Sequence, residues 1–210
     1  MEDIHQVRRL YGALFGTIKK QLTHESVIMQ MIDQFVDVDA DLRKVYNQWT
    51  QFEDFPEFMA GVEKVQQLDA RRLHWVANIG GRQLEWDAEI YEQIPDLIIA
   101  WRSINGEYNE GHIRFERLGP DKTRVHVQFV YEPKENLKKA SNAVAMLGER
   151  VSRDLKRFKD FIENRPQETG AWRGIIHGGR VNRGRVRAMG PRSQRLRRVN
   201  RMTSLDSRVM

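Results

Sequence analysis

The stretch QWTQFEDFPEFM, residues 48–59, is an aromatic-rich segment that stands directly before about eighty residues of alternating strand pattern. Its apolar residues continue the stripe of a short helix that starts at Asp39 or Asp41, the candidate caps, and runs to Trp49. Pro56 is expected near the first turn of a second short helix, where its missing N–H costs nothing. We therefore predict a helical lid or corner beside a sheet.

Beyond Gly61 the period of the apolar residues changes from helical to two. Residues 72–79 and 84–90 flank a Gly80-Gly81 turn and predict a hairpin with one apolar and one acidic face. Three further strands follow, at residues 97–103, 111–118 and 123–131, joined by turns at Asn105-Gly106 and Gly119-Pro120-Asp121. Connections this short imply antiparallel order.

A strand before this meander and a long helix after it complete the pattern. Residues 27–38 are rich in β-branched and apolar side chains and predict the first strand. Apolar residues recur at threes and fours from Leu137 to Ile162, the longest helical pattern of the chain. A helix of that length needs a large apolar surface, which the apolar face of the meander offers. The sequence thus predicts an α+β fold in which a curved antiparallel sheet wraps around one long C-terminal helix.

Charge divides the chain unevenly. Residues 165–210 hold twelve arginines, no lysine and two acids, a balance of 12 − 2 = +10, so the remainder carries 6 − 10 = −4. We expect three parts: an amphipathic helix over residues 1–26, a globular domain over 27–164, and a basic tail over 165–210 that is disordered from Gly170 onward.

The two ends of the chain are candidates for partner contacts. The first helix has its apolar stripe at Ile4, Val7, Tyr11, Leu14 and Ile18, and we favour docking on its own domain, self-association or a partner over lipid contact. The tail is either a solubility tail or a contact for a polyanion, a nucleic acid or an anionic membrane surface. Its candidate polyanion contacts are Arg180, Arg183, Arg185, Arg187, Arg192, Arg195, Arg197 and Arg198.

Several function classes are excluded or disfavoured by composition. The chain has no cysteine, which excludes disulfides, thiol catalysis and thiolate metal ligands. It has no apolar run long enough to span a membrane and no signal-peptide pattern, so we expect a cytoplasmic protein. No histidine pair has helical ligand spacing and no phosphate-binding loop is present, so neither a metal nor a cofactor is expected.

The order strand, two short helices, antiparallel meander and long helix resembles the helix-grip layout of the START-like (SRPBCC) superfamily. The amino-acid sequences of several segments resemble its bacterial polyketide cyclase/dehydrase-like branch, which is related to coenzyme Q-binding proteins and lipid-transport domains. The segments are VYNQW at 45–49, LHW at 73–75, EWDAEI at 85–90, IAWRS at 99–103, YEP at 131–133 and ETGAWR at 168–173.

This resemblance implies a hydrophobic cavity between sheet and long helix, open near the short helices. It also implies binding of a lipid, polyketide or isoprenoid-like molecule there. The ligand-binding candidates are Trp49, Phe55, Phe58, Trp75, Trp86, Trp101, Ser103, Phe115, Phe129, Tyr131, Val144, Leu147 and Val151.

Catalysis would require ionisable groups that converge inside this cavity. The strand alternation instead directs His74, His112 and His126 to the outer face, toward solvent, and places Arg102 near Glu85 or Glu89 there. No catalytic residue is assigned for this reason.

Ser103 and Tyr131 have inward parity and are candidates for hydrogen bonds to a ligand. The other inward positions are nearly all apolar. We therefore rank binding of a hydrophobic small molecule first, and a polyketide aromatase/cyclase or dehydrase that uses the same cavity second.

Overall fold

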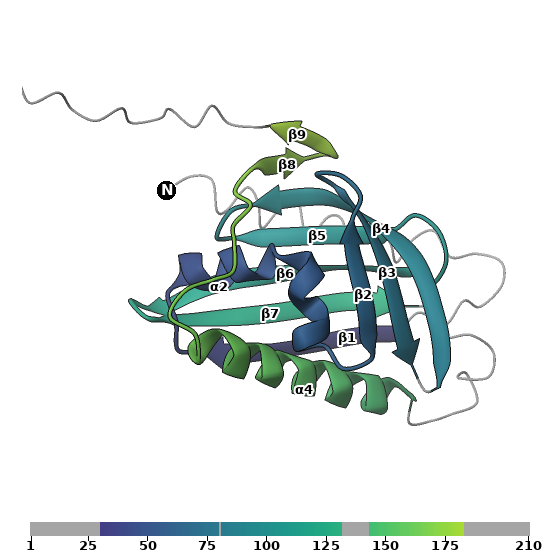
Figure 1. The fold of residues 1–210 in the computed structure, drawn as a ribbon, viewed down its shortest axis with the longest axis horizontal. Helices are drawn as coiled ribbons and strands as arrows, with labels where there is room; N and C mark the ends of the chain where they lie inside the picture. Colours follow the sequence, from purple (N-terminus) through teal and green to yellow (C-terminus); the bar gives the residue numbers. More distant parts are fainter. Residues whose placement is uncertain (1–29, 80, 132–142, 183–210) are drawn as a thin grey trace, which may run out of the picture.

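The structure is a computed structural model that describes residues 30–79, 81–131 and 143–182. Figure 1 shows its elements, which follow in the order β1 (Gln30–Val38), α2 (Leu42–Trp49), the 3-10 helix η1 (Phe52–Glu57), β2 (Val62–Gln67), β3 (Arg72–Ile79), β4 (Arg82–Ile94), β5 (Ile98–Ser103), β6 (Asn109–Gly119), β7 (Lys122–Tyr131), α4 (Ala143–Glu163), β8 (Ile175–His177) and β9 (Arg180–Asn182).

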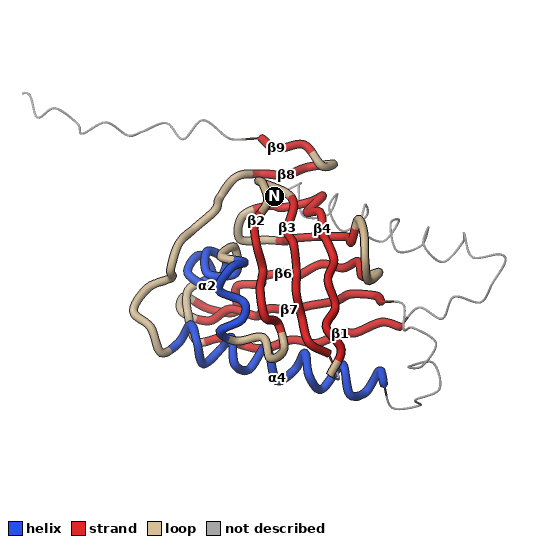
Figure 2. The backbone as a smooth tube through the Cα atoms, turned by 45° about the vertical axis from the view of Figure 1, so that its right-hand side comes forward, coloured by secondary structure: helices blue, strands red, loops and turns tan. Residues whose placement is uncertain are grey.

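The main sheet runs in the order β1-β7-β6-β5-β4-β3-β2 with antiparallel neighbours throughout. It curls so strongly that β2 and β3 cross the view steeply while β5, β6 and β7 lie almost flat, and β4 bends from the first direction to the second (Figure 1). Helix α4 runs along β1 in both views (Figures 1 and 2). The predicted α+β fold, a curved antiparallel sheet with one long C-terminal helix, is confirmed.

Side-chain alternation sets which residues face the helices. Trp75 lies opposite Trp86 and Leu73 opposite Ala88, so the apolar face of the predicted hairpin is the inner face of the sheet. A bulge after Ile90 shifts the register of β4 against β5. Beyond the bulge Gln93 lies opposite the buried inner residue Ile99, and its amide donates to the Tyr46 hydroxyl at 3.0 Å.

The short helices follow their capping signals, with one difference. Asp41 is the N-cap of α2, and its carboxylate accepts from the backbone N–H of Arg43 at 2.8 Å. The second helix is a 3-10 helix, and Pro56 is its fifth residue rather than part of its first turn. Because a 3-10 helix is short, here six residues, the backbone N–H that Pro56 lacks removes at most one hydrogen bond near the end of the element.

A closely packed aromatic cluster fills the space under the short helices, and we call it the closed end. Trp49 meets Phe55, Phe58, Phe115 and Phe158 at ring-centroid distances of 4.6–6.3 Å. Each of these side chains is at most 6% exposed. The cavity was expected to open near the short helices, and this expectation is wrong because these rings occupy the space.

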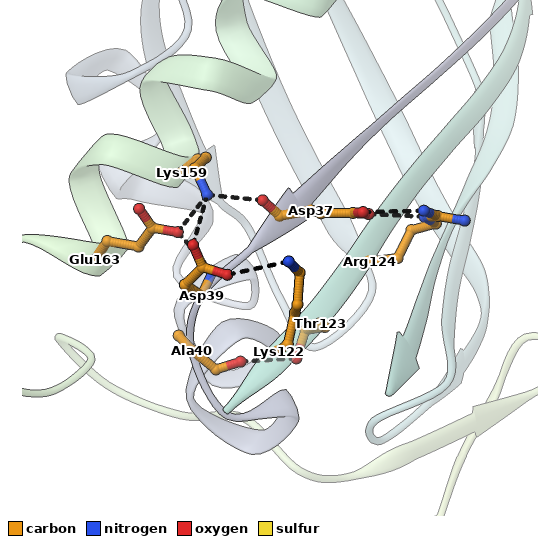
Figure 3. A network of polar contacts seen from close by, with 8 residues as sticks. All are labelled: Asp37, Asp39, Ala40, Lys122, Thr123, Arg124, Lys159 and Glu163. Carbon is orange, nitrogen blue, oxygen red and sulfur yellow. Dashed lines mark hydrogen bonds and ion pairs between the residues drawn. The ribbon is translucent and has the colours of Figure 1, made fainter. Parts of the chain in front are cut away.

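Charged contacts fix the C-terminal half of α4 at the closed end (Figure 3). Lys159 donates to the Asp37 backbone carbonyl at 2.8 Å and to Glu163 at 2.7 Å. Asp37 is also held by two hydrogen bonds from the guanidinium of Arg124 on β7. Helix, edge strand and neighbouring strand are therefore tied together at one end of the sheet.

Residues 170–182 have a defined structure that includes β8 and β9, which corrects the prediction of disorder for this part of the chain. Residues 166–174 form a strap across α2, and β8 pairs with β4 at Ile176 opposite Gln93. The strap meets polar side chains of α2 that are at most 2% exposed. Asn47 donates to Glu168 at 2.7 Å, and Gln48 accepts from the Thr169 N–H at 3.0 Å. The glycines and arginines of this segment led to the prediction of disorder, but residues 175–182 form the β8-β9 hairpin.

Several expectations lie outside the described residues: the helix over 1–26, the start of the long helix before Ala143, and the tail beyond Asn182 with all but one of its candidate arginines. Arg180 itself is an exposed residue of β9. In the part of the chain that the structure describes, no helix has the length and apolar character required to cross a bilayer.

Candidate functional site

The inner face of the sheet changes character away from the closed end. There, large aromatic side chains on the concave face are only half-buried: Trp75, Trp86, Trp101 and Phe129, which we call the aromatic wall. Ile99, Ile113 and Val125, on the same face near α2, are at most 2% exposed. Large apolar side chains that keep accessible surface on a concave face indicate unfilled space beside them.

Two tryptophans form the flat part of the aromatic wall. The rings of Trp75 and Trp86, on neighbouring strands β3 and β4, stack with centroids 5.5 Å apart and an interplanar angle of 9°. Phe55 meets Trp75 edge-on at 5.6 Å, so the pair borders the closed end. The arrangement presents a flat apolar surface toward the space between the sheet and α4.

The other part of the aromatic wall carries polar groups. The indole N–H of Trp101 donates to the Asn109 side-chain oxygen at 3.0 Å, and the Asn109 backbone N–H donates to the Ser103 hydroxyl at 3.1 Å. Tyr131 lies opposite Asn109 across the β6-β7 ladder, and burial raises the pKa of its hydroxyl. Ser103, Asn109 and Tyr131 thus give the site a neutral polar margin.

Gly111 permits the close packing of the aromatic wall. It lies between Trp101 and Phe129 in the ladder, whose ring centroids are 6.5 Å apart. A Cβ atom at this position would meet the Cβ of Phe129 at 2.3 Å and the carbonyl oxygen of Gln128 at 2.5 Å. The two rings therefore approach each other over a strand position that only glycine fits.

The structure separates the ligand-binding candidates into two groups. Four of them are buried in the closed end: Trp49, Phe55, Phe58 and Phe115. Eight are half-buried and lie on the inner face or on α4: Trp75, Trp86, Trp101, Ser103, Phe129, Tyr131, Leu147 and Val151. Val144 lies in the first turn of α4, and its side chain is outside the described part of the structure.

A groove of about 610 Å³ lies between β1 and the N-terminal half of α4. Ile32, one of its lining residues, stands directly opposite Phe129 of the aromatic wall. Gly148 leaves space in the groove, because a Cβ atom at this position would lie within 3.9 Å of the Ile32 side chain. The remaining lining is largely polar: Asp33, Gln34, Glu149, Ser152, Arg153 and Lys156, with Met31 and Ala145.

The ionisable groups lie mostly on the opposite face. His74 pairs with Asp87 at 2.7 Å and His126 with Asp33 at 2.6 Å, both on the outer face as predicted. Arg102 pairs with Glu89 at 3.1 Å, one of its two expected partners. Within the described residues, no group of three His, Asp or Glu side chains is arranged to hold a metal ion.

His112 differs from the expectation that it faces solvent. It lies on the outer face, opposite Ala100 and Gln128, but is only 3% exposed. Burial lowers the pKa of His112 from 6.5 to about 4. Parity correctly predicted the face, whereas burial on that face is not encoded in strand alternation.

The comparisons agree with this architecture. Residues 38–160 match the family described as polyketide cyclase/dehydrase and lipid transport. The chain belongs to this family. An uncharacterized 17.2 kDa protein of Streptomyces lincolnensis is 42% identical over 149 residues, 70% of this chain and 99% of that protein.

Solved structures of the polyketide cyclase/dehydrase and lipid transport fold are more distant in sequence. The Zhui aromatase/cyclase of Streptomyces sp. R1128 has a TM-score of 0.54 at 17% identity, covering 69% of this chain and all of that one. A START superfamily protein of Mycobacterium smegmatis has a TM-score of 0.54 at 19% identity, covering 64% and 97%. These likenesses show the shared fold.

Sequence reasoning missed Asn109 and Gly111. Asn109 closely follows the Asn105-Gly106 turn, and asparagine is common in turns, so the sequence did not indicate that it is the partner of Trp101. Gly111 did carry a signal, because a glycine inside a strand often marks close approach of another group.

Proposed function

We propose that this protein binds a hydrophobic small molecule, of lipid, polyketide or isoprenoid-like character, between the sheet and α4. The observation that supports this is the aromatic wall, whose rings stay half-buried on a concave face while the closed end of the same face is packed. A ligand that covers this surface gains hydrophobic free energy of about 25 cal/mol for each Å² removed from water. The closed end supports the site, and the half-buried residues contact the ligand.

Binding is favoured over the aromatase/cyclase alternative by the placement of proton-transfer groups. A cyclase or dehydrase requires an acid or base at the substrate. The four histidines that the structure describes are His74, His112 and His126 on the outer face, and His177 on the β8-β9 hairpin. Ser103, Asn109 and Tyr131, near the aromatic wall, suit hydrogen bonding to a neutral ligand.

Trp86→Ala tests the proposal directly. If Trp86 contacts the ligand, the variant should bind the fluorescent probe 1-anilinonaphthalene-8-sulfonate at least tenfold more weakly, with little change in the free energy of unfolding in urea. Phe58→Ala is the matched control from the closed end, where Phe58 is 1% exposed, and should lose about 3–5 kcal/mol of stability. A loss of that size in Trp86→Ala itself would make Trp86 a core residue and contradict the assignment.

We propose in addition that the arginines beyond Asn182 contact a polyanion, a nucleic acid or an anionic membrane surface. Nine arginines against one acid over residues 183–210 support this contact by charge alone. The folded β8-β9 hairpin fixes where the test deletion begins, since a chain ending at Asn182 keeps every described element. Binding to a single-stranded RNA or to phosphatidylserine vesicles should be salt-sensitive and lost on deletion of 183–210; equal binding without those residues would contradict it.

A further inference from the structure

Trp75 carries a buried hydrogen-bond donor that the fold leaves without an acceptor. Among the polar side-chain atoms of the described residues, its Nε1 has essentially no exposed surface and no hydrogen-bond partner. A buried indole N–H normally finds an acceptor, because leaving it unmade costs free energy. Trp75 lies within the aromatic wall, so this donor lies beside the surface that the proposed ligand covers.

Trp101 shows how the same sheet satisfies an indole when the protein supplies the partner. Its Nε1 donates to the Asn109 side-chain oxygen at 3.0 Å. Trp101 stands two positions before Ser103 in β5, so this hydrogen bond lies at the polar margin of the site. Trp75 has aromatic neighbours instead, with Trp86 stacked against one side and Phe55 edge-on. Neither of these side chains can accept a strong hydrogen bond.

A phenylalanine would fill an apolar position between Trp86 and Phe55 without burying a donor. The indole is useful here if the acceptor arrives with a ligand. The stacked pair provides the rest of the recognition, since flat indole faces suit a planar ring system. Because Nε1 is covered in the structure, a ligand oxygen reaches it only when the stacked pair turns or parts slightly.

We propose that Trp75 Nε1 donates a hydrogen bond to a carbonyl oxygen of the bound molecule, and that this molecule is a planar, mainly apolar ring system with such an oxygen set within it. The inference rests on the proposed ligand site and specifies its chemistry. Trp75 is then the residue that selects oxygenated ligands over hydrocarbons of the same shape, because a ligand without the oxygen leaves the donor unpaired.

The test compares 9-fluorenone with fluorene, two tricyclic molecules of the same outline that differ by one carbonyl oxygen. In equilibrium dialysis against the full chain, fluorenone should bind roughly tenfold more tightly than fluorene. Trp75→Phe should abolish this preference. Trp86→Phe, the matched control, should weaken both molecules equally and keep the preference.

Indole N–H resonances give a second readout. The chain has five tryptophans, and the Trp75 signal is identified by its loss in Trp75→Phe. Fluorenone should move this N–H signal downfield, as a new hydrogen bond does, and fluorene should not. A preference that survives in Trp75→Phe, or tight binding of both molecules with no preference, overturns the inference and leaves the proposed function intact; failure of both to bind the wild-type protein overturns both.

Discussion

At the scale of single residues, two positions show how closely the inner and outer faces are specified. Gly111 carries no side chain where Trp101 and Phe129 approach across the sheet, and His112, its neighbour in β6, points to the other face and is buried there. Gly111 allows the aromatic wall to pack because it has no side chain. His112 is a titratable group that is buried on the outer face. Each yields a measurable expectation.

Gly111→Ala should destabilise the protein by roughly 1–3 kcal/mol, because its Cβ overlaps the Phe129 side chain and the adjacent backbone. Gly119→Ala is the control in the same strand, since a Cβ there would lie at an ordinary contact distance of 3.7 Å from the Cβ of Lys122. Urea unfolding of both variants measures the difference. Equal stability of the two would show that the strand has room at Gly111.

His112 predicts a loss of stability in mild acid. Its folded pKa lies near 4, below 6.5, so the unfolded chain takes up the proton first as the pH falls. The stability is therefore fully present above pH 6.5 and is lost as the pH falls through about 4, by on the order of 2–3 kcal/mol. The side chain of His177, 73% exposed, has its pKa raised by Glu92 and works weakly in the opposite direction.

The measurement is the free energy of unfolding at pH 7, 5 and 4 in the wild type and in His112→Gln, which cannot ionise. The variant should show a flatter dependence on pH, whatever its stability at pH 7. An unchanged slope would mean that His112 titrates normally in the folded protein.

At the scale of elements, the strap after α4 does more than end the domain. Asn47, Gln48 and Thr50 of the α2 region, each at most 2% exposed, take hydrogen bonds from or give them to residues 168–173. Arg173 also holds Asp96 through two hydrogen bonds of 2.9 and 2.6 Å. The strap therefore links the closed end to the β4-β5 turn.

A chain that ends at Asn164 should lose about 3 kcal/mol or more relative to one that ends at Asn182. It gives up the burial of Ile176, which is fully buried, and the partners of three buried polar side chains. The 1–182 chain should match the full-length protein within about 0.5 kcal/mol in urea unfolding. Equal stability of the two shortened chains would mean that the strap contributes nothing to the fold.

These elements also show which parts of the fold are readable from sequence. The strands from β3 to β7 alternate strongly, and their boundaries were predicted within a few residues. β2 was missed because VEKVQQ, residues 62–67, has only two apolar positions, and β8 and β9 because three residues each are too few for a period.

The site was less predictable than the fold. Parity identified the inner face, but which inner residues are packed and which border open space depends on the volume that α2, η1 and α4 fill. That volume cannot be deduced from a periodicity, and the opening of the cavity was therefore expected near the short helices, where the aromatic rings are packed. The Trp101–Asn109 hydrogen bond likewise depends on the β5-β6 register.

At the scale of the whole molecule, the two ends of the space between the sheet and α4 differ. The C-terminal half of α4 is tied to β1 by Lys159 and to the loop after η1 by Arg157, which donates to the Phe58 carbonyl at 3.1 Å. The aromatic wall lies on the inner face beyond this fixed end. This combination of a packed closed end and a half-buried aromatic surface is the basis of the proposed binding function.

The most direct test is mass spectrometry of the protein purified from its own organism, first under native and then under denaturing conditions. We expect a native mass above 24.8 kDa and release of one defined, mainly apolar molecule on denaturation, with Trp86→Ala carrying less of it. A protein that retains no organic molecule, and that binds neither apolar probes nor fluorenone when these are supplied, would contradict the claim that the grip is a binding site.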